Sequence, residues 1–241
     1  MIKLIKLEYK KNNIKKYIII TLILTSILLL FCFAQTYLGI ARDSDTGVVD
    51  AVEGANTVDS YVDLFTTISF LILSSAMQST FIVDAYKNKT MDLMFQYPIG
   101  RKKILISKIL AVLIFSFAAL VLCKLIIYIV LYIGSFYLTP DFLVEGVNLA
   151  SASFYFRIIL QSLSTVCLSI IALYIGLLWK STKAPVITSF LLILLSQGNI
   201  GQFTLVSSKV FPVVLIAVSI ICAFLCVIKV ETKDVGGGKE T

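Results

Sequence analysis

Residues Ile109–Leu138 read ILAVLIFSFAALVLCKLIIYIVLYIGSFYL, a stretch in which Lys124 is the only charged side chain. A helix needs roughly 20 mostly apolar residues to cross a hydrocarbon core about 30 Å thick, so the stretch predicts a membrane-spanning helix. Five more apolar stretches predict spans near Tyr17–Ile40, Tyr61–Val83, Phe154–Trp179, Pro185–Gln197 and Phe211–Ile228. The predicted fold class is therefore an all-α, polytopic membrane protein with six transmembrane helices.

The fifth span is short, because its apolar run breaks at Gln197-Gly198-Asn199. This break predicts a helix that ends early, followed by a tight or re-entrant connection buried in protein rather than facing lipid. The composition, 59% hydrophobic and 15% charged, also differs strongly from that of soluble proteins. We expect a basic N-terminal helix at residues 1–16, a six-helix domain at 17–228 and a tail at 229–241.

Lysine and arginine gather in alternate gaps between the spans, namely residues 1–16, 84–108, 180–184 and 229–241. Cationic residues favour cytoplasmic flanks, so both termini are predicted to be cytoplasmic. The first outer loop is instead acidic and carries Asp43, Asp45, Asp50, Glu53 and Asp59. The net charge of +7 thus records membrane topology and does not indicate a nucleic-acid partner.

The residues of the common catalytic sites are missing from this sequence. It contains no histidine, which excludes a Ser-His-Asp triad, a Cys-His pair and an H-E-x-x-H zinc helix. Cys222 and Cys226 lie one helical turn apart, but a metal site needs further ligands. We therefore expect no catalytic residues, no metal and no cofactor bound by the chain itself.

The inner segment 84–108 is the most distinctive part of the sequence. Leu93, Met94 and Tyr97 recur at helical spacing before Pro98, which predicts a short amphipathic helix along the membrane surface. Arg101 begins a cationic cluster that would anchor the next span at the lipid headgroups. The alternative is an ordinary basic loop whose charges only set topology.

The same segment resembles the first cytoplasmic loop of ABC-2-type transporter permeases. That loop commonly has an acidic residue, an aromatic or basic stretch, Asn-x-Thr and apolar residues, followed by Pro-Ile-x-Arg and, some residues later, a Lys. The matching positions, with the two apolar neighbours, are Asp84, Tyr86, Asn88, Thr90, Leu93, Met94, Tyr97, Pro98, Ile99 and Arg101, with Lys108 following. The overall layout is also similar to that of the family, with a basic N-terminal segment, six spans and a C-terminal tail of basic and acidic residues. The small size most resembles permeases of lantibiotic self-immunity and antibiotic efflux.

The resemblance implies that a separate ATPase subunit, which binds ATP and Mg²⁺, docks on this loop. It also implies that two permease chains, as a homo- or heterodimer, form a pathway for an amphipathic peptide or small molecule. Two other functions stay open. One is a non-transporting immunity or signalling protein that sequesters a peptide or regulates a partner, and the other is an ion-extruding permease.

The N-terminal segment places Lys3, Lys6 and Lys10 on one helical face. This pattern is typical of a helix lying in the bilayer interface with its cations toward anionic lipid. Two roles are consistent with this pattern. The segment could only set the membrane topology, or it could be an elbow helix that also contacts the ATPase.

Polar residues at helical spacing mark the second, third and fourth spans. Such stripes usually face the bundle interior, where they form hydrogen bonds between helices. Packing and substrate contact are both open roles for them. The candidate residues for the translocation path are Gln78, Lys124, Tyr128, Arg157 and Gln161.

Lys124 lies about 14 residues, or roughly 20 Å, before the predicted outer end of its span, which is too far for its stem to reach the surface. No Asp or Glu occurs in the middle of any predicted span. We therefore expect no fixed ion pair within the chain. Gln161, Tyr128, water, a second protomer or an acidic group of a substrate would meet the ammonium.

Overall fold

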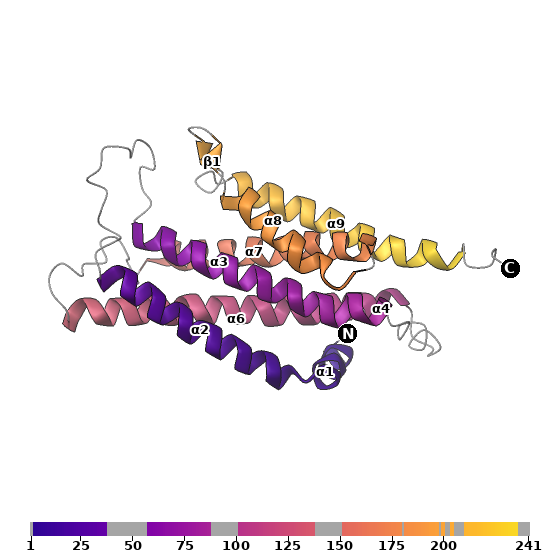
Figure 1. The fold of residues 1–241 in the computed structure, drawn as a ribbon, viewed down its shortest axis with the longest axis horizontal. Coiled ribbons are helices and arrows are strands. Elements are labelled where there is room, and N and C mark those ends of the chain that lie inside the picture. Colours follow the sequence, from indigo (N-terminus) through magenta and orange to yellow (C-terminus); the bar gives the residue numbers. More distant parts are fainter. Residues whose placement is uncertain are drawn as a thin grey trace.

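The structure is a computed structural model that describes residues 2–37, 57–87, 101–137, 151–179, 181–197, 199–200, 203–204 and 210–235. Its long helices run side by side and reverse direction from one to the next (Figure 1). They are α2 (Ile14–Tyr37), α3 (Thr57–Gln78), α6 (Arg101–Tyr137), α7 (Ala152–Trp179), α8 (Ala184–Gln197) and α9 (Val210–Val235).

Four of the described helical stretches are long and apolar enough to cross a membrane, namely Ile14–Tyr37, Val58–Val83, Lys103–Ser135 and Ala152–Trp179. The apolar parts of the last two helices, Ala184–Ser196 and Val214–Cys226, are shorter. The helical fold class and four of the spans are thus confirmed, while the count of six spans stays a prediction. α8 ends at Gln197, as predicted, and an antiparallel pair of two-residue strands follows, β1 (Asn199–Ile200) and β2 (Phe203–Thr204).

The short helix α1 (Ile2–Lys11) precedes α2 and lies against α6 at one end of the bundle, which we call the α1 end (Figure 1). Asn13 separates the two helices with a φ of 49°, a left-handed conformation that asparagine tolerates better than most residues. The Asn12 backbone N–H donates to the Glu8 carbonyl oxygen at 3.0 Å and completes the last turn of α1. The end of α9 and the start of α6 lie at the same end.

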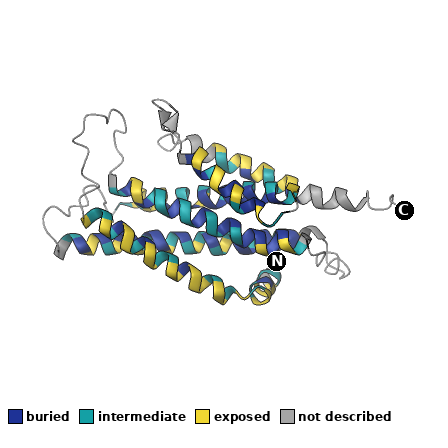
Figure 2. Ribbon diagram, viewed as in Figure 1, coloured by how far each residue is buried: buried dark blue, intermediate teal, exposed yellow. Residues whose placement is uncertain are grey.

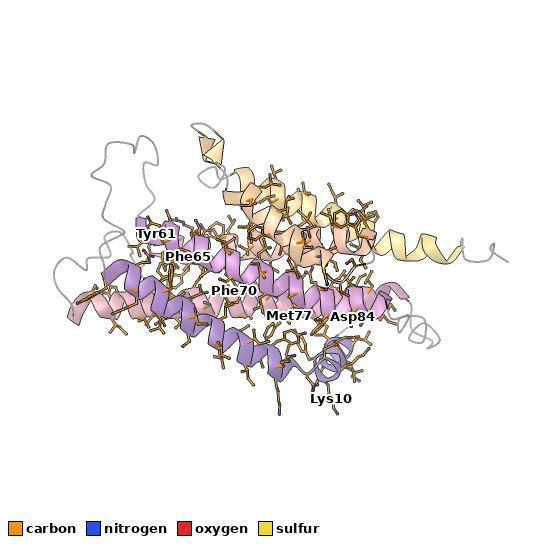
Figure 3. The ribbon with its side chains drawn as sticks, viewed as in Figure 1. Lys10, Tyr61, Phe65, Phe70, Met77 and Asp84 are labelled. Atoms are coloured by element: carbon orange, nitrogen blue, oxygen red, sulfur yellow. The ribbon has the colours of Figure 1, made fainter. Side chains whose placement is uncertain are left out.

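The centre of the bundle consists of α3, α6 and α7, with α2 on one side and α8 and α9 on the other (Figure 1). Figure 2 shows that burial concentrates on the central helices, whereas α2 is largely exposed. Phe70 and Met77 on α3 have 1% and 0% of their surfaces exposed (Figure 3). Lipid is as apolar as these side chains, so close van der Waals packing, rather than the hydrophobic effect, holds the helices together.

α3 continues into a π-helical turn, η1 (Ser79–Val83), and then the short α4 (Asp84–Lys87). In η1 the Asp84 N–H bonds to the Ser79 carbonyl oxygen, one residue beyond the α-helical spacing. The turn packs against Gly176 of α7, where an added Cβ would overlap the Pro185 ring of α8 and lie 3.4 Å from Val83. Glycine therefore allows three elements to approach closely at the α1 end.

Candidate functional site

Charged side chains from three helices meet at the end of the bundle opposite α1. Asp59 and Asp63 lie one turn apart on α3, Lys124 and Tyr128 one turn apart on α6, and Arg157 near the start of α7. The Lys124 Nζ lies 2.7 Å from Asp63 Oδ1, and the Arg157 Nη1 lies 3.4 Å from Asp59 Oδ2. Tyr128 is almost completely buried and packs edge-to-face on Phe154 of α7 at 4.9 Å. We call Asp59, Asp63, Lys124, Tyr128 and Arg157 the Lys124 cluster.

The pair between Lys124 and Asp63 shows that our expectation of no ion pair within the chain was wrong. The predicted depth of Lys124 assumes that its helix ends with the hydrocarbon core, but α6 has 37 residues and is about 55 Å long, well beyond a 30 Å core. α3, which runs beside it, begins at Thr57, only six residues before Asp63. Lys124 therefore meets the second turn of its neighbour, and Asp59 belongs to that helix rather than to an outer loop.

A second buried lysine lies at the α1 end, on the same helix. Lys108 has 1% of its surface exposed, and its Nζ donates to the Phe81 carbonyl oxygen of η1 at 3.0 Å. The same ammonium lies 3.5 Å from Glu8 Oε2 of α1. We call Glu8, Phe81 and Lys108 the Lys108 junction, because these residues join α1, η1 and α6.

Two hydroxyls add to the attachment of the N-terminal helices. The Tyr9 hydroxyl donates to the Ala111 carbonyl oxygen of α6 at 2.7 Å, and burial raises the pKa of the Tyr9 phenol above its ordinary value. The Tyr17 hydroxyl lies 2.8 Å from Thr80 Oγ1 in η1. Lys3, Lys6 and Lys10 remain exposed on α1, and Lys10 projects away from the bundle (Figure 3).

The chain is similar to known proteins over most of its length. A family model described as "ABC-2 family transporter protein" matches residues 4–196, a range that includes both buried lysines. The chain belongs to the ABC-2 transporter family. It is also 22% identical over 237 residues to a protein of Bacillus subtilis (strain 168) named "Uncharacterized protein YcbO", covering 96% of this chain and 99% of that protein. No solved structure matches it.

Membership of the ABC-2 family makes the chain a multi-pass plasma-membrane protein and a transporter permease. Such permeases are the non-catalytic transmembrane subunits of their transporters. An ABC ATPase partner is implied by the family.

Of the path residues predicted in this ABC-2 permease, Lys124, Tyr128 and Arg157 come together in the Lys124 cluster. Gln78 does not, because it lies toward the α1 end and donates to Ser169 Oγ at 2.8 Å. Ser74 also donates to that oxygen, so the α3 and α7 stripes form hydrogen bonds between helices as expected for packing. Gln161 is half-buried on α7, one turn after Arg157.

The predicted ATPase-docking residues are only partly described. Asp84 is exposed at the start of α4, Tyr86 belongs to α4, and Arg101 begins α6. The others lie outside the described residues, namely Asn88, Thr90, Leu93, Met94, Tyr97, Pro98 and Ile99. Their role stays a prediction.

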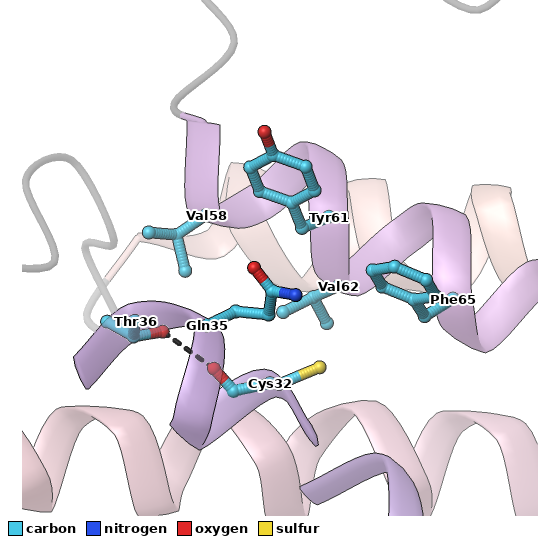
Figure 4. A pocket seen from close by; sticks show the side chains of 7 residues that line it. All are labelled: Cys32, Gln35, Thr36, Val58, Tyr61, Val62 and Phe65. Atoms are coloured by element: carbon cyan, nitrogen blue, oxygen red, sulfur yellow. Dashed lines mark hydrogen bonds between the residues drawn. The ribbon is translucent and has the colours of Figure 1, made fainter. Parts of the chain in front are cut away.

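A small recess lies between α2 and α3 of the permease (Figure 4). Its α3 side is formed by the same stretch of sequence that carries Asp59 and Asp63. It is lined by Cys32, Gln35, Thr36, Val58, Tyr61, Val62 and Phe65. Its volume of about 10 Å³ leaves room for about one water molecule, far less than an amphipathic substrate needs.

The carboxylates that pair with the two buried lysines and with Arg157 were not among the predicted site residues. Glu8 is the only acidic residue before Asp43 in a strongly basic segment, which could have marked it as a partner for a buried cation. Asp59 and Asp63 follow the one-turn spacing of a shared helix face at the start of an apolar run. The Phe81 carbonyl has no sequence signal, because it depends on the π-helical turn.

Proposed function

We propose that the chain is the transmembrane permease subunit of an ABC exporter, which expels an amphipathic compound such as an antimicrobial peptide or a drug. A separate ATPase subunit binds ATP and Mg²⁺ and drives the cycle. Two permease chains work together, each with six spans and with both termini in the cytoplasm.

The Lys108 junction is the observation that supports this proposal most directly. The turn η1 immediately precedes the segment 84–108 that resembles an ATPase-docking loop, and Lys108 ends it. The ammonium of Lys108 therefore links the two ends of that segment to each other and, through Glu8, to α1. A movement imposed on the segment by an ATPase would be passed directly to α3, α6 and α1.

The orientation can be tested with single cysteines introduced at Thr46 and at Asn88. The distribution of lysine and arginine predicts that an impermeant thiol reagent labels the first position in intact cells and spares the second. Labelling at Asn88 would overturn both the orientation and a cytoplasmic docking segment. Permeabilised cells, in which both positions react, serve as the control.

The ATPase partnership can be tested by affinity purification of Leu93→Asp and Tyr97→Asp from the native cells. A carboxylate in an apolar interface is costly without a partner, so the ATPase subunit should be lost while the permease still inserts. Met91→Asp is the matched control, because helical spacing places it on the face opposite Leu93. ATPase recovered equally from all three variants would favour a basic loop that only sets topology.

A further inference from the structure

The Lys124 cluster holds its two cations in unequal ways. The Lys124 ammonium has no exposed surface and lies 2.7 Å from Asp63, a normal length for a charge-assisted hydrogen bond. Arg157 lies farther from its partners, at 3.4 Å from Asp59 and 3.9 Å from Asp63, and 43% of its side chain is exposed. Arg157 is therefore the weakly held and accessible member of the cluster.

Asp59 retains unused capacity to accept hydrogen bonds. Only 4% of its surface is exposed, and its Oδ1 has no hydrogen-bond partner within the part of the chain that the structure describes. A buried carboxylate oxygen without a donor is unfavourable, and removing the counter-charge would make it more so. The position thus favours any cation that can donate hydrogen bonds at shorter range than Arg157 does.

Aromatic and apolar side chains lead from Asp59 to the surface. Tyr128 of the Lys124 cluster packs edge-to-face on Phe154 at 4.9 Å, and Phe154 packs on Tyr155 at 5.6 Å. Tyr155 is 43% exposed and Phe156 is 68% exposed on α7 beside Arg157. Aromatic rings beside a carboxylate suit an organic cation, whose charge interacts with the ring faces and whose chain packs on the apolar surface.

We propose that Asp59 and Arg157 form a binding site for the ammonium or guanidinium group of an amphipathic molecule. Arg157 occupies this site in the free protein as an internal competitor. The cation of the ligand replaces the Arg157 guanidinium and donates to both oxygens of Asp59, while the apolar part of the ligand lies on the α7 surface beside Tyr155 and Phe156. Lys124 keeps Asp63 neutralised throughout, so the exchange leaves the charge of the cluster balanced.

The identity of this ligand as the exported substrate rests on the proposed function. Binding of the ligand to the site does not depend on that function. The test therefore uses the permease alone, in nanodiscs of phosphatidylcholine, and measures binding of hexylguanidinium by isothermal titration calorimetry. Hexanol and hexanoate provide uncharged and anionic ligands with the same chain, and empty nanodiscs correct for partition into lipid. Saturable binding is expected for hexylguanidinium alone.

Two substitutions separate the exchange from a purely structural role. Asp59→Asn should weaken hexylguanidinium binding by at least about tenfold, because the charged acceptor is lost. Arg157→Gln should tighten binding severalfold, because the competitor is gone, whereas a merely structural arginine would weaken it on removal. Lys183→Gln removes the same charge from an exposed position between α7 and α8 and should change nothing.

Unchanged or weaker binding in Arg157→Gln would overturn the exchange, and unchanged binding in Asp59→Asn would overturn the site. Binding of hexanoate that is lost in Arg157→Gln would identify an anion site instead. If Arg157→Gln does not fold, Arg157→Lys keeps the charge with fewer donors and should still tighten binding. Binding without any stimulation of ATPase or export would leave this site standing and count against the proposed function.

Discussion

Two lysines on α6, sixteen residues apart, are almost completely buried, yet their partners differ in kind. Lys124 pairs at 2.7 Å with a carboxylate on another long apolar helix, and a second ion pair lies beside it. Lys108 lies 3.5 Å from a carboxylate on the short helix α1 and donates to a backbone carbonyl in a π-helical turn. The first arrangement ties α3, α6 and α7 together, and the second ties α6 to elements at the margin of the bundle.

This difference separates a fixed part of the permease from a part suited to movement. A short ion pair between two helices is costly to open where one of its charges has no exposed surface, as for Lys124. At the Lys108 junction, we expect that α1 can move away while the ammonium keeps its bond to the Phe81 carbonyl. We therefore expect Lys124 to maintain the bundle and Lys108 to keep contact with a changing partner.

The largest effect is expected from Lys124→Met, which leaves the half-buried Asp63 with Arg157, at 3.9 Å, as its remaining cation among the described residues. Breaking a buried pair in this way costs about 3–5 kcal/mol, so yield and thermal stability of the purified permease should fall sharply. Adding Asp63→Asn restores the charge balance and should recover much of the loss. Normal stability of Lys124→Met together with lost export would instead make Lys124 a residue of the transport path.

A smaller effect is expected from Lys108→Met, which removes the donor to Phe81 and the partner of Glu8. Hydrogen bonds to charged groups contribute about 1.5–3 kcal/mol, and part of this loss can be offset because the Asn12 side-chain amide still donates to Glu8 Oε2 at 3.3 Å. Hydrogen exchange should increase in α1 and η1 and stay unchanged in the first turns of α3 and α7. Lys103→Met, an exposed lysine on the same helix, is the control. Increased exchange at Asp59 and Asp63 would show that the two ends are not independent.

The sequence predicts the helices of both ends better than their contacts. The end of α8 at Gln197 and the helix at the N-terminus follow from apolar runs and a basic lead, which are local properties. Pairing of Lys124 with Asp63 depends on how far α6 extends beyond α3 and on the rotation of each helix, which tertiary packing sets. The π-helical turn that presents the Phe81 carbonyl likewise has no local signature, so the Lys108 junction could not be predicted.

A packing substitution next to η1 tests how far the α1 end can deform without any change of charge. Gly176→Ala places a methyl group against the Pro185 ring and close to Val83. Overpacking of this kind costs about 1–3 kcal/mol in a rigid core and less where neighbours can shift. We expect a melting temperature between those of wild type and Lys108→Met. Pro185→Ala in the same chain should relieve the overlap, and failure to do so would place the strain elsewhere.

The smallest effect is expected from Tyr9→Phe, which removes the hydrogen bond from α1 to the Ala111 carbonyl and leaves the apolar ring in place. A neutral hydrogen bond contributes about 0.5–1.5 kcal/mol, so trypsin should cleave after Lys10 and Lys11 severalfold faster at pH 8. Tyr61→Phe, at the other end of the bundle, should leave the rate unchanged.

The pH dependence of this contribution follows from the pKa of Tyr9, which burial raises above its ordinary value of 10.0. The folded protein favours the neutral phenol, so the contribution is complete below pH 10 and is lost as the pH rises through the folded-state pKa. Hydrogen exchange of α1 should therefore differ between wild type and Tyr9→Phe at pH 8, and the difference should shrink in strongly alkaline solution. The absence of any difference at pH 8 would mean that Tyr9 holds α1 through ring packing alone. A difference that stays constant in strongly alkaline solution would mean that the hydroxyl keeps its bond to the Ala111 carbonyl without titrating.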